Sequence, residues 1–318
     1  MAKRVGKKRD ARPLPARPAS SQASSPLITD AKLKQIYSAM LKCRILGLRL
    51  RGLREKNKST AKSRAALGTE AVTVAATIDL RRGDWLAPSQ GDILAGFLRG
   101  TSLASIFSES HPPASREVNS QESEKYGPLK ILPPTVSLTA QLGIASGVAM
   151  AMKSSGKGSM VLVLCGDAST AGKSWQDALS FAGTHCLSLV VLVEVKAPVQ
   201  TVSRQKTMPR NQIAEGKACG FPVIPVDAHD AVAMYRVAHE SIHKARHGGG
   251  PTLIEATVFR EQERSPAINV PQLPDAVARM EGYLTAKGIF SLSWKKSLVE
   301  KFNRDVDAAI EAVESGRN

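Results

Sequence analysis

Long apolar runs and paired cysteines are both missing from this sequence of 318 residues. No stretch approaches the roughly 20 apolar residues that a membrane-spanning helix needs. The basic amino-terminal segment also lacks the apolar core of a secretory signal. The four cysteines, Cys43, Cys165, Cys186 and Cys219, are scattered without metal-ligand spacing, which favours reduced structural thiols. We therefore expect a cytoplasmic protein that makes no membrane contact.

Aromatic residues are scarce, at 4% of the chain, and residues 1–28 contain none. The first 26 residues hold seven Lys or Arg against one acidic residue, a large share of the net charge of +16. This segment is rich in Pro, Ala and Ser, so we expect residues 1–28 to be a disordered tail with an attachment or solubility role. Nucleic-acid binding is the weaker interpretation, because the tail has no aromatic side chain for base stacking and the chain has no recognised binding motif.

Residues 29–318 have the composition and pattern of one α/β domain. Continuous apolar strands are expected at 159–165, 187–194, 221–226 and 251–259, and they alternate with helices. This alternation predicts a mostly parallel sheet covered on both faces. The expected helices are 29–56, 68–80, 92–100, 139–153, 173–183, 211–218, 230–247, 273–287 and 291–314, with a long loop at 109–137.

Ligands of open parallel sheets bind beyond the carboxyl ends of the strands. Three loops are expected there, at 166–172, 196–205 and 260–265, with Lys196 opening the second. The first loop ends in Gly172, Lys173 and Ser174, as a phosphate-binding P-loop does. Its glycine spacing is wrong for a P-loop, however, and Asp167 stands where the first glycine should be, so a metal-binding turn is the competing interpretation.

Several ordered motifs of this domain resemble a known family. They are ALGTEAV (66–72), TAQLGIASGVAMA (139–151), GDASTAGKSWQDALSFA (166–182), VSRQ (202–205) and PTLIEATVFR (251–260). Together they resemble the alpha subunits of thiamine diphosphate-dependent 2-oxo acid dehydrogenases, of the pyruvate and branched-chain type. The resemblance covers nearly all of the chain from about residue 30 and implies a three-layer α/β/α thiamine diphosphate-binding fold. It also implies an oxidoreductase that decarboxylates a 2-oxo acid and transfers the acyl unit to a lipoyl group.

The resemblance assigns thiamine diphosphate and magnesium to the turn after the 159–165 strand. Gly166, Asp167, Ala168, Ser169 and Lys196 take the cofactor positions, with Asp167 as the metal ligand. Hard cations prefer oxygen ligands. The other interpretation of Asp167 is a carboxylate that caps the next helix or pairs with a lysine, and Lys196 either neutralises it or holds a phosphate group by its own charge.

Four positions depart from the family pattern. Ala168 replaces the second glycine of Gly-Asp-Gly, Lys196 replaces a magnesium-binding asparagine, and Gly91 replaces an arginine that contacts the diphosphate. Arg264 stands at the position of the catalytic-loop histidine, where it is either an anion-binding group or a solvated loop residue. These changes predict a degenerate cofactor site, so we expect either an impaired enzyme subunit or a non-catalytic scaffold of the same fold. A P-loop-like nucleotide binder is the least favoured class.

The resemblance also implies partners, because the family's cofactor lies between subunits. We expect a beta-type subunit and self-association into a heterotetramer, with a lipoyl acyltransferase as a further partner. Two side observations remain. Gln141 matches the family and is interpreted as a helix-packing residue, and His229, His239 and His243 fall on one expected helix. His239 and His243 are spaced i, i+4, but without a Glu-x-x-His context they are interpreted as surface residues rather than a metal pair.

Overall fold

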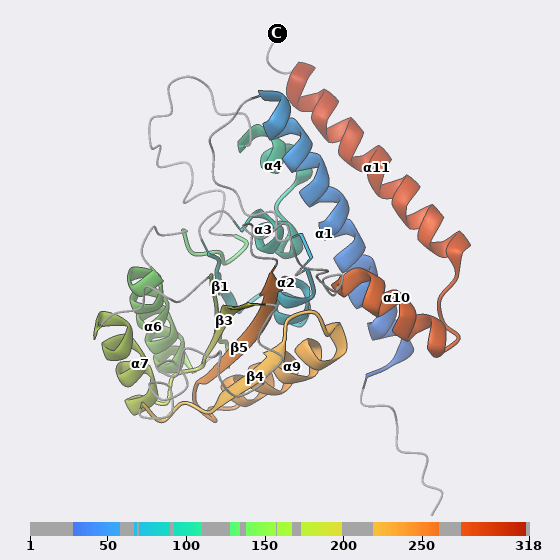
Figure 1. Ribbon diagram of the computed structural model, residues 1–318. Helices are drawn as coiled ribbons and strands as arrows, with labels where there is room; N and C mark the ends of the chain where they lie inside the picture. Colours follow the sequence, from blue (N-terminus) through green and yellow to red (C-terminus); the bar gives the residue numbers. More distant parts are fainter. Residues whose placement is uncertain are drawn as a thin grey trace, which may run out of the picture.

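The computed structural model describes residues 28–57, 67–68, 70–89, 92–109, 128–133, 138–156, 158–166, 173–198, 219–260 and 275–315. These residues form a parallel sheet with helices on both of its faces (Figure 1). In chain order the elements are α1 (Asp30–Asn57), α2 (Glu70–Thr77), β1 (Trp85–Ala87), α3 (Ile93–Arg99), α4 (Leu103–Glu109), α6 (Leu138–Ser155), β2 (Val161–Cys165), α7 (Lys173–Thr184), β3 (Leu189–Pro198), β4 (Val223–Asp227), α9 (Ala231–Arg246), β5 (Thr252–Arg260), α10 (Ala276–Ala286) and α11 (Leu292–Ser315).

The described sheet has five strands in the order β1-β2-β3-β5-β4, and every neighbouring pair is parallel. All five residues of β2 are buried, as expected for a central strand whose two faces are both covered by helices. The predicted α/β architecture with a parallel sheet is therefore confirmed.

Each face of the sheet packs against its own pair of helices. On one face, Leu142 of α6 and Trp175 and Leu179 of α7 join the inward side chains of β2 and β3. On the other face, α2 and α9 pack against the sheet and against each other. The helices α1, α10 and α11 form a further layer outside α2, at the right of Figure 1.

The long helix α1 is defined by a cap at its start and by buried residues that contact the carboxyl-terminal helices. Its first turn is capped by Thr29, whose hydroxyl accepts a hydrogen bond from the Lys32 amide at 3.3 Å. Its buried residues recur at helical spacing, and Tyr37 among them packs against Phe290 and Trp294 at ring-centroid distances of 5.8 and 5.3 Å. The helix therefore joins the carboxyl-terminal helices to the sheet layer.

Most of the expected elements are confirmed within a few residues, and the differences have physical causes. The strand β1, with three residues, is too short for a periodic signal and was not expected, and neither was the helix α4. β1 exists because both of its sides are paired, with β2 and with Ile131. His229 lies in the turn before α9 rather than on the helix, since Asp230 is the N-cap, so that expectation was wrong.

Other expectations lie outside the described residues, including the tail up to residue 27, the helix at 211–218 and most of the loop at 109–137. Cys43, Cys165, Cys186 and Cys219 all lie among the described residues and form no disulfide there, in agreement with the expected thiols. In the part of the chain that the structure describes, no helix combines the length and apolar character needed to cross a membrane.

Candidate functional site at the carboxyl edge of the sheet

The carboxyl edge of the sheet is stepped rather than level. Cys165, the last residue of β2, pairs with Val193 of β3, and Val193 in turn pairs with Glu255 of β5. β3 and β5 both continue five residues past that level, which is about 16 Å at the usual rise of about 3.3 Å per strand residue. β2 therefore ends at Cys165, directly before Gly166, while the neighbouring strand β3 and its partner β5 continue beyond it.

Lys196 lies in the part of β3 that extends past the end of β2, and the expectation that it opens a loop was wrong. β3 runs on to Pro198, and Lys196 pairs with Val258 in the ladder with β5. The strand is longer than its apolar sequence suggested because β5 supplies a partner for every added residue. The backbone position of Lys196 is thereby fixed in the sheet, three residues beyond the level at which β2 ends.

The other predicted site residues are placed only in part. Gly166 is described and is half-buried directly after β2. Asp167, Ala168, Ser169, Gly91 and Arg264 lie outside the described residues. Among the assigned positions, the structure therefore brings together the start of the 166–172 turn and the backbone of Lys196, on neighbouring strands.

Gln141 fastens the ends of two strands at this edge. Its side-chain amide is buried and donates to the backbone carbonyls of Ala87, at 2.8 Å, and Pro88, with a longer contact of 3.4 Å to Leu164. These carbonyls belong to the ends of β1 and β2, where the ladder leaves acceptors without strand partners. The interpretation of Gln141 as a packing residue is confirmed, and its amide nitrogen serves the protein backbone.

Asp92 is likewise engaged by the fold. It is the N-cap of α3, and its Oδ1 accepts from the Ala95 amide at 3.1 Å. Such a cap satisfies one of the free N–H groups of the helix start. α3 ends at Gly100, whose φ of 106° is the left-handed conformation that favours glycine.

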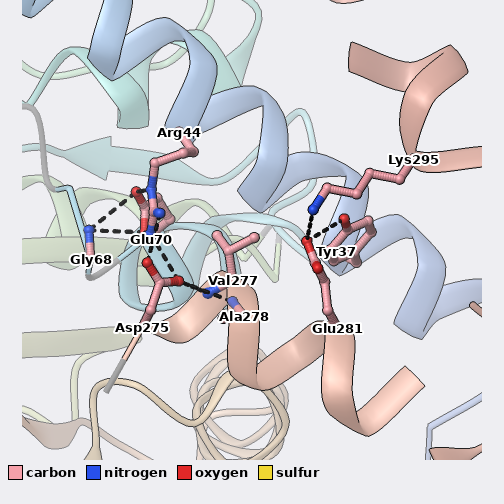
Figure 2. Close-up of polar contacts among 9 residues, drawn as sticks. All are labelled: Tyr37, Arg44, Gly68, Glu70, Asp275, Val277, Ala278, Glu281 and Lys295. Carbon is pink, nitrogen blue, oxygen red and sulfur yellow. Dashed lines mark hydrogen bonds and ion pairs between the residues drawn. The ribbon is translucent and has the colours of Figure 1, made fainter. Parts of the chain in front are cut away.

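A cluster of ion pairs joins α1 to the starts of α2 and α10 (Figure 2). Arg44 of α1 bonds both carboxylate oxygens of Glu70, including Nη2 to Oε2 at 2.8 Å, and its Nη1 reaches Asp275 at 2.7 Å. Glu70 is fully buried and also accepts from the Gly68 amide at 3.1 Å. Arg44 therefore joins the start of α2 to the N-cap of α10, which are the ends of the chain segments 58–69 and 261–274.

The charges of this cluster stabilise one another. The hydrogen bond to Glu70 is the main reason that the pKa of Arg44 lies above its usual value, although burial acts against it. Burial pushes the pKa of Asp275 upward, but hydrogen bonds from Arg44 and from the α10 backbone outweigh burial, so the pKa is lowered. Arg44 and Asp275 therefore remain ionised over the physiological pH range.

Glu255 is a feature that sequence reasoning missed. It is 1% exposed, and burial raises its pKa to about 7. Alternation along β5 places it on the same face as Leu253, between Val193 and Pro225, and its Oε2 has no hydrogen-bond partner among the described residues. The available signal was a single glutamate inside the apolar strand PTLIEATVF.

The residues at the predicted cofactor positions do not match a magnesium–diphosphate site of the resembled family. Asp167 offers oxygen ligands, but the paired position is Lys196, and a protonated amine has no lone pair for a metal. The strand ladder holds that lysine position in register, so a one-residue slip cannot bring a neighbouring side chain there without breaking the pairing with β5.

Comparisons with known proteins agree with this architecture. A family model described as "Dehydrogenase E1 component" matches residues 37–318. The chain is 28% identical over 266 residues to a pyruvate dehydrogenase E1 component subunit alpha of Acholeplasma laidlawii, covering 78% of this chain and 74% of the relative. It is 26% identical over 309 residues to the protein of the same name from Bacillus cereus, covering 91% and 80%.

A solved transketolase from Pichia stipitis shares the fold, with a TM-score of 0.51 at 17% identity over 88% of this chain. This chain spans 45% of the transketolase chain, and the likeness bears on the fold alone. The E1 family implies dependence on thiamine diphosphate. Because the family model matches almost the whole folded domain, the chain belongs to the dehydrogenase E1 component family, as an alpha-subunit-like member of the 2-oxo acid dehydrogenase type.

Proposed function

We propose that this chain is the alpha-type subunit of a decarboxylating 2-oxo acid dehydrogenase component with an impaired cofactor site. The reaction is the oxidative decarboxylation of a 2-oxo acid with acyl transfer to a lipoyl group on an acyltransferase partner. Family membership and curated relatives named as pyruvate dehydrogenase alpha subunits support this class of reaction. The working assembly is a heterotetramer with a beta-type chain, because an alpha-type chain supplies only part of the site.

The observation that carries the impairment is the ladder position of Lys196. Its backbone is paired with Val258 well inside β3, so a cationic residue is built into the sheet where the family has a magnesium ligand. By sequence, Ala168, Gly91 and Arg264 also replace residues that the resemblance assigns to the thiamine diphosphate site. Asp167 is the one predicted metal ligand that remains, and Gly166, Ala168 and Ser169 complete the turn.

The test is calorimetric titration of thiamine diphosphate with magnesium into the chain, purified together with a beta-type chain. We expect the parent complex to bind weakly and Lys196→Asn to bind at least tenfold more tightly, about 1.4 kcal/mol or more in binding free energy. Asp167→Ala should remove the remaining binding. Lys296→Asn is a matched control, since Lys296 is a 78% exposed lysine of α11 and belongs to none of the candidate cofactor positions.

The outcomes separate the alternatives. Micromolar or tighter magnesium-dependent binding by the parent complex would overturn the impairment and leave the enzyme assignment intact. An unchanged affinity in Lys196→Asn would show that this lysine is not what weakens the site. Absence of binding in every variant of a complex that demonstrably assembles would favour the non-catalytic scaffold.

A further inference from the structure

Three histidines lie on the solvent side of α9 and its carboxyl end, and they belong to none of the candidate cofactor positions. His239, His243 and His247 are spaced four residues apart, so each lies about one turn beyond the last on one face of the helix. All three are exposed. The rings of His243 and His247 are 4.1 Å apart between centroids, with an angle of 31° between their planes.

His239 is held in one orientation by a carboxylate. Its Nδ1 lies 2.6 Å from Oδ2 of Asp79, while its side chain is 51% exposed. A carboxylate only accepts hydrogen bonds, so Nδ1 carries the hydrogen and the neutral ring presents its lone pair at Nε2. Asp79 is itself fixed by Lys32 at 3.0 Å and Tyr235 at 2.8 Å.

The ionised state of Asp79 is favoured by these contacts. Burial alone would raise its pKa, but the hydrogen bonds from His239, Tyr235 and Lys32 outweigh burial and lower it. The arrangement is the one in which a carboxylate orients a metal-binding imidazole and increases its basicity. The i, i+4 spacing alone favoured a pair of surface histidines, and the Asp79 contact is the tertiary observation that changes this interpretation.

His247 is also anchored, but against the helix itself. Its Nδ1 lies 2.7 Å from the backbone carbonyl of His243, which likewise can only accept. The ring of His247 is thus tied to the end of α9 and stacked on His243. His243 lies between two anchored rings and is the histidine shared by both i, i+4 pairs.

We propose that His239 and His243 bind one divalent transition-metal ion of the zinc, copper or nickel class through their imidazole nitrogens, with Asp79 orienting His239. Imidazole suits these metals, and side chains four residues apart on a helix are neighbours on its surface. Within the described ranges no group of three or more His, Cys, Asp or Glu is arranged to hold a metal. Water therefore completes the coordination, and the ion is exchangeable rather than structural.

The nearby charges permit a cation at this place. Lys32 is bonded to Asp79, and Lys244 is directed to the carbonyl of Pro251 at 2.9 Å. Glu240 is exposed beside His239, which balances the exposed Arg236 one turn earlier. Arg246, which donates to the backbone carbonyl of Asp79 at 2.7 Å, is paired with the carboxylate of Asp84.

The test is a zinc titration of the full-length, metal-stripped chain, monitored by competition with a chromophoric zinc indicator. We expect one ion per chain, and at least tenfold weaker binding in His239→Ala and in His243→Ala. Asp79→Asn should weaken binding by about 10- to 100-fold, the usual effect of losing an orienting carboxylate. His185→Ala is the matched control, an exposed histidine in the turn after α7, and should stay within twofold of the parent.

Unchanged affinity in both His239→Ala and His243→Ala would overturn the site. An equal loss in His185→Ala would show that zinc binds the surface without selection, and a loss in His247→Ala as large as that in His239→Ala would overturn the assigned pair. His243→Ala is expected to melt close to the parent temperature, whereas His239→Ala also loses the hydrogen bond to Asp79, so the melting temperature of each variant is measured beside its zinc affinity. The zinc measurement needs neither thiamine diphosphate nor a beta-type chain, so its result is independent of the proposed function.

Discussion

Two buried glutamates of this domain have opposite surroundings. Glu70 is fully buried and accepts hydrogen bonds from the Arg44 guanidinium and from the Gly68 amide. Glu255 is 1% exposed, and its Oε2 has no partner among the residues that the structure describes. Burial is the same in both cases, but only Glu255 has a side-chain oxygen without a partner, and burial raises its pKa to about 7.

The largest test of this comparison removes the partner of Glu70. Arg44→Met leaves Glu70 buried and uncompensated and also takes a donor from Asp275, so we expect a loss of about 3–5 kcal/mol in the free energy of unfolding. Urea denaturation of both proteins measures it. Arg51→Met is the matched control, since Arg51 is 64% exposed and pairs with Glu55 one turn later, which is worth only about 0.3–0.5 kcal/mol.

If Arg44→Met cost no more than Arg51→Met, Glu70 would not depend on its guanidinium partner. Hydrogen-bond partners would then not explain the difference between Glu70 and Glu255.

The next test concerns the pH dependence of stability. The pKa of Glu255 is raised from 4.5 to about 7 in the folded protein, so the folded state holds the proton more tightly than the unfolded chain. Stability is then lost as the pH rises from about 4.5 through about 7, by about 3–4 kcal/mol in total. Glu255→Gln removes this titration, so its advantage over the parent should be small at pH 5 and largest at pH 8.

Denaturation midpoints measured from pH 5 to pH 8 give the comparison, with the exposed Glu240→Gln as control. Parallel curves for Glu255→Gln and the parent would mean that Glu255 ionises normally and has a partner that stabilises its charge.

The smallest test uses Glu281, a carboxylate of intermediate exposure. Its Oε1 accepts from the Tyr37 hydroxyl at 2.8 Å and pairs with Lys295 at 2.7 Å (Figure 2). Burial and the bond to Glu281 raise the pKa of Tyr37 well above its usual value, so the hydroxyl keeps its proton. Tyr37→Phe should cost about 1 kcal/mol, and less than Arg44→Met, because Lys295 and water still solvate the carboxylate.

Thermal unfolding compares Tyr37→Phe with Tyr283→Phe, whose side chain is exposed. A loss of several kcal/mol in Tyr37→Phe would place Glu281 with Glu70 among the acids that depend on one partner.

The elements of the fold could be predicted where the local pattern was long. Continuous apolar strands and helical periodicity were sufficient for β2, β5, α1 and α9. The carboxyl limit of β3 could not be predicted, because Val195 to Pro198 are strand residues only through their pairing with β5. The error matters for the site, since it moved Lys196 from a loop into the sheet.

The sequence predicted where the candidate site lies in the chain, but it did not predict the contacts of the side chains there. The order of motifs placed the cofactor positions directly after the 159–165 strand, and the structure confirms that a buried strand ends at Cys165. No local pattern indicated that Glu255 lacks a partner, that Gln141 bonds the ends of two strands, or that Asp79 reaches His239 across 160 residues.

The sequence by itself determined that the sheet is parallel, which family the chain belongs to and which residue types stand at the cofactor positions, because contiguous motifs contain this information. The tertiary structure alone decided strand length, charge partners and the orientation of His239. These depend on groups that are far apart along the chain, and hydrogen bonds and desolvation act between such groups only after the chain has folded.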